Sequence, residues 1–252
     1  MAVPIRIERR GAISIVTIDR PEVRNAMNGP AARALTNAID AIDDDPATFL
    51  SILTGAGGHF CAGADLKAAA ANGHSGSHTE RGPMGMCRRP SVKPMIAAIE
   101  GVAAGGGFEM AIACDLIVAA EDARMGLPEV KRNLVANGGG LLRLPRRIPS
   151  NIAAEIALTG ALYPADFFCR YGLINRLTPP GSALAGALAL AGDLLANGPT
   201  ALAATTAILR MATGEGEWAA QSALAARALE SEDRHEGARA FVEKRAPVWT
   251  GR

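Results

Sequence analysis

The chain contains one local pattern twice: a short apolar segment, a glycine-rich turn and the start of a helix. Phe49–Thr54 is followed by the turn Gly55–Gly63, and helical character begins at Asp65. Met95–Ile99 is followed by a turn with three consecutive glycines, and a helix is expected from about Phe108. A repeated unit of this kind predicts an α/β fold built from similar units. The first N–H groups of a helix lack acceptors, so two such helix ends side by side would offer two donors to one oxygen.

The other segments predict further strands and helices around these two units. Ile5–Arg9 and Ile13–Asp19 alternate apolar and polar side chains around Gly11 and predict a β-hairpin. Helices are expected after Pro30 and over 65–71, 138–145, 152–158, 164–171, 184–195, 201–211, 219–229 and 236–244, with short strands at 116–119 and 172–177. The stretch 72–89 has no period and is expected to be a mobile loop or a short irregular helix. We expect a β/α core over 1–195 and a helical region over 196–252.

Composition argues against several classes of protein. Of the 252 residues, 49% are hydrophobic, which is enough for the core of one large domain. A net charge of +1 and an aromatic content of 4% argue against a nucleic-acid binder. No apolar run is long enough to span a membrane, and the N-terminus shows no secretion signal. The four cysteines form no CxxC pair, which indicates reduced thiols and a cytoplasmic location.

Two carboxylates accompany the second glycine turn. Glu109 lies in an apolar run, where a carboxylate is costly unless it is paired or protonated, and Glu129 follows a proline. Such groups often act as acids or bases, although a structural carboxylate that accepts backbone hydrogen bonds would fit Glu109 too. The glycine turns match neither a dinucleotide fingerprint nor a P-loop, and their functional interpretation is an oxyanion hole. His59 and Cys61 have no further ligands at usable spacing, so no metal is expected.

An ordered set of motifs runs through the chain: Arg20-Pro21, Arg24–Met27, Phe60–Lys67, Lys93–Gly101, Gly105–Glu109, Cys114-Asp115, Pro128-Glu129, Ser231–Gly237 and Phe241–Arg245. With these motifs the chain resembles the enoyl-CoA hydratase/isomerase (crotonase) superfamily over essentially its full length. The resemblance implies a spiral core of ββα units with a C-terminal α-helical trimerisation region, assembled as a homotrimer or homohexamer. It also implies an acyl-CoA thioester substrate of lipid metabolism, with no cofactor beyond the coenzyme A of the substrate.

The resemblance also implies which residues form the site. The backbone N–H groups of Ala64 and Gly106 match the family's oxyanion hole, which holds the thioester oxygen. Arg24 matches the loop that flanks the CoA phosphates, and Lys244 matches a tail lysine that can reach CoA. The full set of residues expected to contact the substrate or CoA is Arg24, Ala26, Ala62, Ala64, Asp65, Leu66, Lys67, Gly106 and Lys244.

The two glutamates distinguish subfamilies. Hydratases that resemble this chain use both, whereas typical isomerases keep only the counterpart of Glu129. We therefore expect an enoyl-CoA hydratase that adds water reversibly to a 2-enoyl-CoA and gives 3-hydroxyacyl-CoA. Glu109 would be the base on water and Glu129 the proton donor to Cα.

Other activities stay open at this stage. The run 138–145 looks more like carnitinyl-CoA dehydratase, and Asn137 is expected to add a polar group near the acyl pocket. A dehydratase of that type and an isomerase are alternatives on the same fold. A non-catalytic or RNA-binding homologue is the alternative of another class. Acyl specificity is expected to depend on 72–89.

Overall fold

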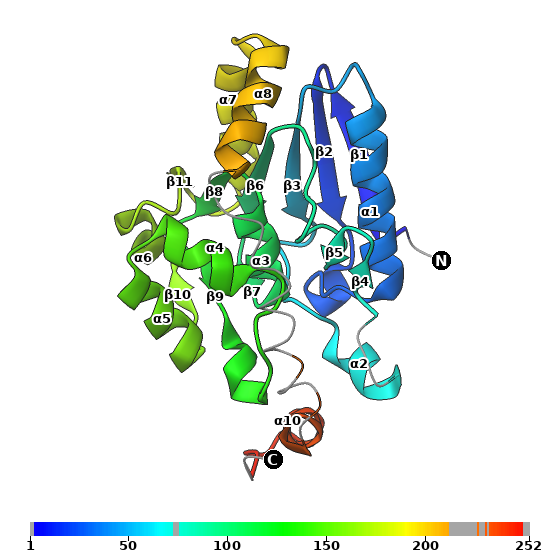
Figure 1. The fold of residues 1–252 in the computed structure, drawn as a ribbon, viewed down its shortest axis with the longest axis vertical. Coiled ribbons are helices and arrows are strands. Elements are labelled where there is room, and N and C mark those ends of the chain that lie inside the picture. The colour runs from blue at the N-terminus through cyan, green and yellow to red at the C-terminus, as the bar shows by residue number, and fades with distance from the viewer. Residues whose placement is uncertain (1–2, 73–75, 212–225, 227–229, 231, 249–252) are drawn as a thin grey trace.

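A six-stranded sheet organises the computed structural model, which describes residues 3–72, 76–211, 226, 230 and 232–248 (Figure 1). Its order is β1-β2-β3-β6-β8-β11, with β1 and β2 antiparallel and the other neighbours parallel. The strands are β1 (Ile5–Arg10), β2 (Ile13–Ile18), β3 (Leu50–Gly55), β6 (Met95–Ile99), β8 (Leu116–Ala120) and β11 (Arg176–Thr178). A second sheet has the order β10-β9-β7, and β4 pairs with β5. These short strands are β7 (Val102–Ala104), β9 (Arg124–Gly126), β10 (Tyr163–Pro164), β4 (His78–Thr79) and β5 (Gly82–Pro83).

Alternating side chains of the central sheet point to opposite faces and pack into two separate hydrophobic cores. In β6, Met95, Ala97 and Ile99 enter the larger core, which also contains the apolar faces of α1 (Gly29–Asp44) and α3 (Gly106–Ala113). The smaller core lies on the other face, where α7 covers the sheet. Helix α7 (Ala183–Leu195) presents Ala183, Ala187 and Ala191 there, and these small side chains allow close packing.

The remaining helices surround this framework (Figure 1). They are α2 (Leu66–Asn72), α4 (Gly140–Arg147), α5 (Ser150–Thr159), α6 (Ala165–Arg170), α8 (Pro199–Met211) and α10 (Glu232–Glu243), with the 3₁₀ turns η1 (Pro21–Val23) and η2 (Pro128–Arg132). Helix α10 packs against η2 and α2 at the end of the molecule opposite α7 and α8. None of the helices in the described part of the chain is long and apolar enough to cross a membrane.

Most predicted elements are confirmed, and the differences have local causes. Helix α3 begins at Gly106, before the predicted start at Phe108. Its first residues are glycines because the chain approaches closely there: a Cβ on Gly107 would lie 2.1 Å from the carbonyl oxygen of Cys61. The predicted strand at 172–177 is limited to β11 at its end, and β7, β9 and β10 were not predicted. The predicted helix at 219–229 lies outside the described residues, apart from residue 226.

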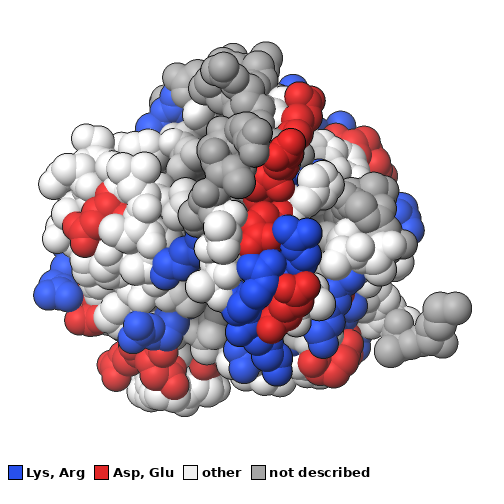
Figure 2. Space-filling model, turned by 90° about the horizontal axis from the view of Figure 1, so that it is seen from below, with Lys and Arg blue, Asp and Glu red and all other residues white. Residues whose placement is uncertain are grey.

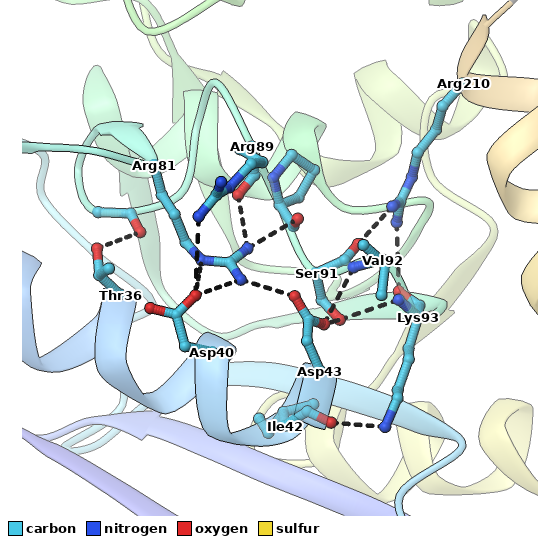
Figure 3. A network of polar contacts seen from close by, with 12 residues as sticks. Thr36, Asp40, Ile42, Asp43, Arg81, Arg89, Ser91, Val92, Lys93 and Arg210 are labelled. Carbon is cyan, nitrogen blue, oxygen red and sulfur yellow. Dashed lines mark hydrogen bonds and ion pairs between the residues drawn. The ribbon is translucent and has the colours of Figure 1, made fainter. Parts of the chain in front are cut away.

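The prediction of a mobile loop or irregular helix for 72–89 is wrong in its described part. The segment contains the β4–β5 hairpin, and Arg81 fastens it to α1 (Figure 3). Hairpins this short leave no periodicity in the sequence, so the pattern could not reveal them.

Candidate functional site

The second glycine turn ends in a helix start with a free donor. Gly105 has φ 55° and ψ −127° and precedes the first residue of α3. Its own N–H donates to the carbonyl of Gly126 at 2.9 Å. Gly106 is the first residue of α3, so its N–H has no acceptor within the helix.

The first glycine turn lies directly against the second. The N–H of Cys61 donates to Val102, and the carbonyl of Cys61 accepts from Ala104 at 3.0 Å. Gly63 has φ 93°, and a Cβ there would lie 2.7 Å from the oxygen of Ala104 and 3.3 Å from the nitrogen of Gly106. Only glycine fits this close approach.

Ala64 is held in a defined orientation by its neighbours. Met27 donates its N–H to Gly63 at 2.8 Å and accepts from Asp65 at 2.9 Å. Met27 and Ala64 form a parallel β-bridge. Its hydrogen bonds are made by Gly63 and Asp65, the residues on either side of Ala64, so the N–H of Ala64 points away from Met27. The two predicted donor positions, Ala64 and Gly106, therefore lie on neighbouring segments.

Glu109 projects from the first turn of α3 into a cradle of glycines. Its side chain is buried, and the N–H of Gly140 donates to Oε1 at 2.9 Å. A Cβ on Gly138 would lie 2.5 Å from Oε2, so a larger residue there would displace the carboxylate. The glycine run before α4 thus surrounds the carboxylate.

Glu129 approaches the same glycine turn from η2. A Cβ on Gly105 would lie 2.9 Å from Oε1 of Glu129, and the carbonyl of Gly105 accepts from the N–H of Glu109. Oε2 of Glu129 is buried and has no hydrogen-bond partner among the described residues. A buried oxygen without a partner is costly and marks a position where a ligand or water could bind.

Burial shifts the titration of both carboxyls. Desolvation raises the pKa of Glu109 to about 7, against the opposing effect of hydrogen bonds from Gly140 and Gly138 and of the charge of Arg143. Desolvation raises the pKa of Glu129 to about 8, and the negative charge of Glu109 adds to that shift. Two such groups titrate as a pair and share one proton near neutral pH.

These shifts predict a pH-dependent gain in stability when either carboxylate is neutralised. Both groups bind protons more tightly in the folded protein than at their ordinary pKa of 4.5. Their contribution to stability is therefore full below about pH 4.5 and is lost as the pH rises through about 7 to 8. The melting temperature of Glu109→Gln or Glu129→Gln, relative to wild type, should rise between pH 4.5 and 8.5 in thermal unfolding. A difference that stays constant across this range would contradict the shifts.

The residues predicted to contact CoA gather around the first turn, with different exposures. Arg24 is exposed in a left-handed conformation, and its carbonyl accepts from Ala62 at 3.0 Å. Ala26 is buried, whereas Lys67 is exposed at the start of α2 and Leu66 is half-buried.

Asp65 and Lys244 differ in what they can reach. Both carboxylate oxygens of Asp65 are used: Oδ2 pairs with Arg20 at 3.1 Å, and Oδ1 accepts from the N–H of Ala68 at 3.1 Å. Asp65 thus shapes the loop and the start of α2. Lys244 is exposed just after α10, which packs against α2 and η2.

Several contacts at the site were not predicted. The run Gly138–Gly140 was visible in the sequence, but its partner Glu109 lies in a different element. The contact between Gly105 and Glu129 and the position of Met84 above Gly106 also depend on tertiary structure. Within the described residues no group of three or more His, Cys, Asp or Glu side chains could hold a metal ion.

Comparisons with known proteins agree on one family. A family model described as enoyl-CoA hydratase/isomerase matches residues 8–252. The enoyl-CoA hydratase EchA19 of Mycobacterium tuberculosis is 41% identical over 98% of this chain and 96% of its own length. The mevalonyl-coenzyme A hydratase sidH of Aspergillus fumigatus is 41% identical over 94% and 91%. A crystal structure of a carnitinyl-CoA hydratase from Mycobacterium avium has 41% identity and a TM-score of 0.94, with full coverage of both chains. The chain thus has the crotonase fold and belongs to the enoyl-CoA hydratase/isomerase family.

Proposed function

We propose that this protein is an enoyl-CoA hydratase that adds water reversibly to a 2-enoyl-CoA thioester. The observation that carries the proposal is that two carboxylate residues meet at the Gly105 turn: Glu109 is buried and donates its N–H to Gly105, and Glu129 brings its carboxyl against Gly105 with a buried, unpartnered Oε2. Their raised pKa values leave the pair with one proton near neutral pH, which is what a proton-transfer reaction needs. The names of the relatives, hydratases of three different acyl-CoA esters, support the same chemistry.

In the proposed mechanism the amides of Ala64 and Gly106 donate to the thioester oxygen. Ionised Glu109 removes a proton from water as the water oxygen bonds to Cβ. The electron pair of the Cα–Cβ double bond moves toward the thioester, and the two amides stabilise the negative charge that develops on oxygen. Protonated Glu129 then donates its proton to Cα, which gives 3-hydroxyacyl-CoA. Coenzyme A is part of the substrate, so the reaction needs no further cofactor.

The proposed CoA site uses the rim around the first turn. Arg24, Lys67 and Lys244 are exposed and cationic, and they would pair with the phosphates of CoA. The backbone of Ala62, Ala64 and Leu66 would border the pantetheine. Ala26 and Asp65 are proposed to hold this rim in shape. A cytoplasmic location stays a prediction.

The test is a product analysis with purified protein and a set of thioesters. Crotonyl-CoA should gain the mass of one water, and 3-hydroxybutyryl-CoA should lose it. If 3-enoyl-CoA is converted to 2-enoyl-CoA faster than crotonyl-CoA is hydrated, the result would favour an isomerase instead. If carnitinyl-CoA is dehydrated faster than 3-hydroxybutyryl-CoA, the result would favour a carnitinyl-CoA dehydratase. No conversion of any thioester would contradict the proposal.

An RNA-binding homologue is less well supported. Figure 2 shows that acidic and basic side chains are interleaved on the face that it presents. Nucleic-acid binding depends on a continuous basic surface, because neutralised phosphates supply most of the affinity. Salt-dependent retention on immobilised RNA would revive this alternative.

We also propose that the region over 196–252, which the sequence predicts to be helical, mediates assembly into a homotrimer or homohexamer. Ile208 and Leu209 of α8 are 66% and 65% exposed in the single chain, as expected for side chains that a second copy covers. Sedimentation should show a species three or six times the 26.0 kDa chain mass. A monomer at all concentrations would contradict this proposal.

A further inference from the structure

Met84 occupies an unusual position beside the proposed oxyanion hole. A Cβ placed on Gly106 would lie 2.7 Å from Sδ of Met84 and 3.0 Å from its Cε and Cγ. The thioether therefore fills the space next to the first residue of α3. Met84 is buried and has φ 58°, a left-handed conformation that residues other than glycine rarely adopt. Backbone strain of this kind persists where the surroundings enforce it, and it often marks a functional position.

The segment that carries Met84 runs along the first turn of α3. Cys87 is buried three residues later, and burial followed by the negative charge of Glu109 raises the pKa of its thiol. Met84 thus lies next to Gly106, and Cys87 lies near Glu109, one helical turn farther on. Opposite Glu109 stands the Gly138–Gly140 turn. A thioester carbonyl held by the amide of Gly106 would therefore lie beside the thioether of Met84.

The segment that carries Met84 is held in place by α1 (Figure 3). The buried guanidinium of Arg81 donates to Asp40 at 2.6 and 2.8 Å and to Asp43 at 2.7 Å. It also donates to the carbonyls of Arg89 and Pro90, both at 3.1 Å. These bonds fix both ends of the stretch that contains Met84.

A second attachment fixes the residue next to Met84. The hydroxyl of Thr36 donates to the carbonyl of Gly85 at 2.9 Å. A Cβ on Gly85 would lie 2.3 Å from the oxygen of Ala32, so loop and helix are in direct backbone contact. Met84 is therefore a side chain on a rigid support, and only its own torsions can adapt to a substrate.

We propose that Met84 limits the length of the acyl group, so that the protein acts on short or compact acyl-CoA thioesters and excludes long straight chains. This inference rests on the proposed hydratase function. It identifies a substrate class by size: the thioether fills the space next to Gly106, and there it would block extension of the acyl group beyond the reacting carbons.

The test compares hydration of crotonyl-CoA and trans-2-decenoyl-CoA by wild type, Met84→Ala and Met84→Gly. The ratio of kcat/KM for decenoyl-CoA to that for crotonyl-CoA should rise about tenfold or more in both variants, because the pocket gains several methylene volumes. Met84→Gly also relieves the left-handed strain, so it should fold even if the alanine variant does not. The matched control is Met86→Ala, which removes a second methionine of the same loop from the core. It should lower the melting temperature and leave the ratio unchanged.

Three results would overturn the inference, and the two that leave the hydratase function standing are distinguishable from the one that does not. If wild type hydrates crotonyl-CoA but neither Met84 variant changes the ratio, Met84 does not set chain length while the hydratase function stands. A wild type that already prefers decenoyl-CoA would have the same consequence. If wild type hydrates no enoyl-CoA, the proposed function fails and the inference fails with it.

Discussion

Replacement of either carboxylate by its amide is expected to lower kcat for hydration of crotonyl-CoA by about 10²–10⁴-fold. In the proposed mechanism, Glu109→Gln removes the group that accepts the proton of water, and Glu129→Gln removes the group that donates a proton to Cα. Both glutamines keep nearly the original volume. The N–H of Gly140 can still donate to the side-chain oxygen at position 109, so the geometry of the glycine cradle should persist. The measurement is steady-state hydration, with Glu121→Gln as an exposed carboxylate that should behave as wild type.

A second measurement separates the two roles. Butyryl-CoA has no double bond to hydrate, but a base near Cα can exchange its α-proton with D₂O while the amides hold the enolate oxygen. Glu109→Gln should keep this exchange, because Glu129 remains and its pKa falls once the neighbouring negative charge is gone. Glu129→Gln should lose it. The reverse pattern would exchange the two assignments, and wild-type hydration by both variants would end the proposed mechanism.

The sequence predicted the elements that bear the site better than it predicted their surroundings. The hairpin β1–β2 follows from alternation, the strands β3, β6 and β8 from short apolar runs, and helices α1 and α7 from helical patterns. The glycine turns were visible because glycine runs are rare in regular elements. The short strands β7 and β9 were not, since three residues carry too little periodicity. They are nevertheless what brings the two turns together, through the hydrogen bonds of Cys61 and Gly105.

The chemical character of the site was only partly predictable. The apolar run around Glu109 indicated a carboxyl group with a shifted pKa, but a structural carboxylate that accepts backbone hydrogen bonds fitted the sequence equally well. The structure gives Glu109 both properties: the backbone of Gly140 binds it, and burial still raises its pKa. No sequence pattern pointed to Met84, because its importance depends on a left-handed backbone and on contacts with α1. Motif reasoning identifies residues that act through the backbone or a charge, and it misses residues that act through shape.

Removal of the Gly106 N–H is expected to lower kcat by about 10²–10³-fold, the cost of one oxyanion-hole donor. Proline is the substitution that removes the donor. Residue 106 is the first residue of α3, where proline is tolerated because the N–H makes no bond within the helix. Gly105 has φ 55° and ψ −127°, the mirror image of the extended conformation that residues adopt before proline. Because glycine has no Cβ, Gly105 can retain this conformation when proline follows it.

The matched pair controls for the added side chain. Any Cβ at position 106 would collide with the thioether of Met84, so both members carry Met84→Ala. Gly106→Ala in this background adds the Cβ and keeps the N–H, whereas Gly106→Pro adds it and loses the N–H. With similar melting temperatures, the proline variant should hydrate crotonyl-CoA about 10²–10³-fold more slowly than the alanine variant, and its KM should change far less. Equal kcat values would mean that the amide of Gly106 does not hold the developing charge. The stabilisation would then have to come from Ala64 or another donor.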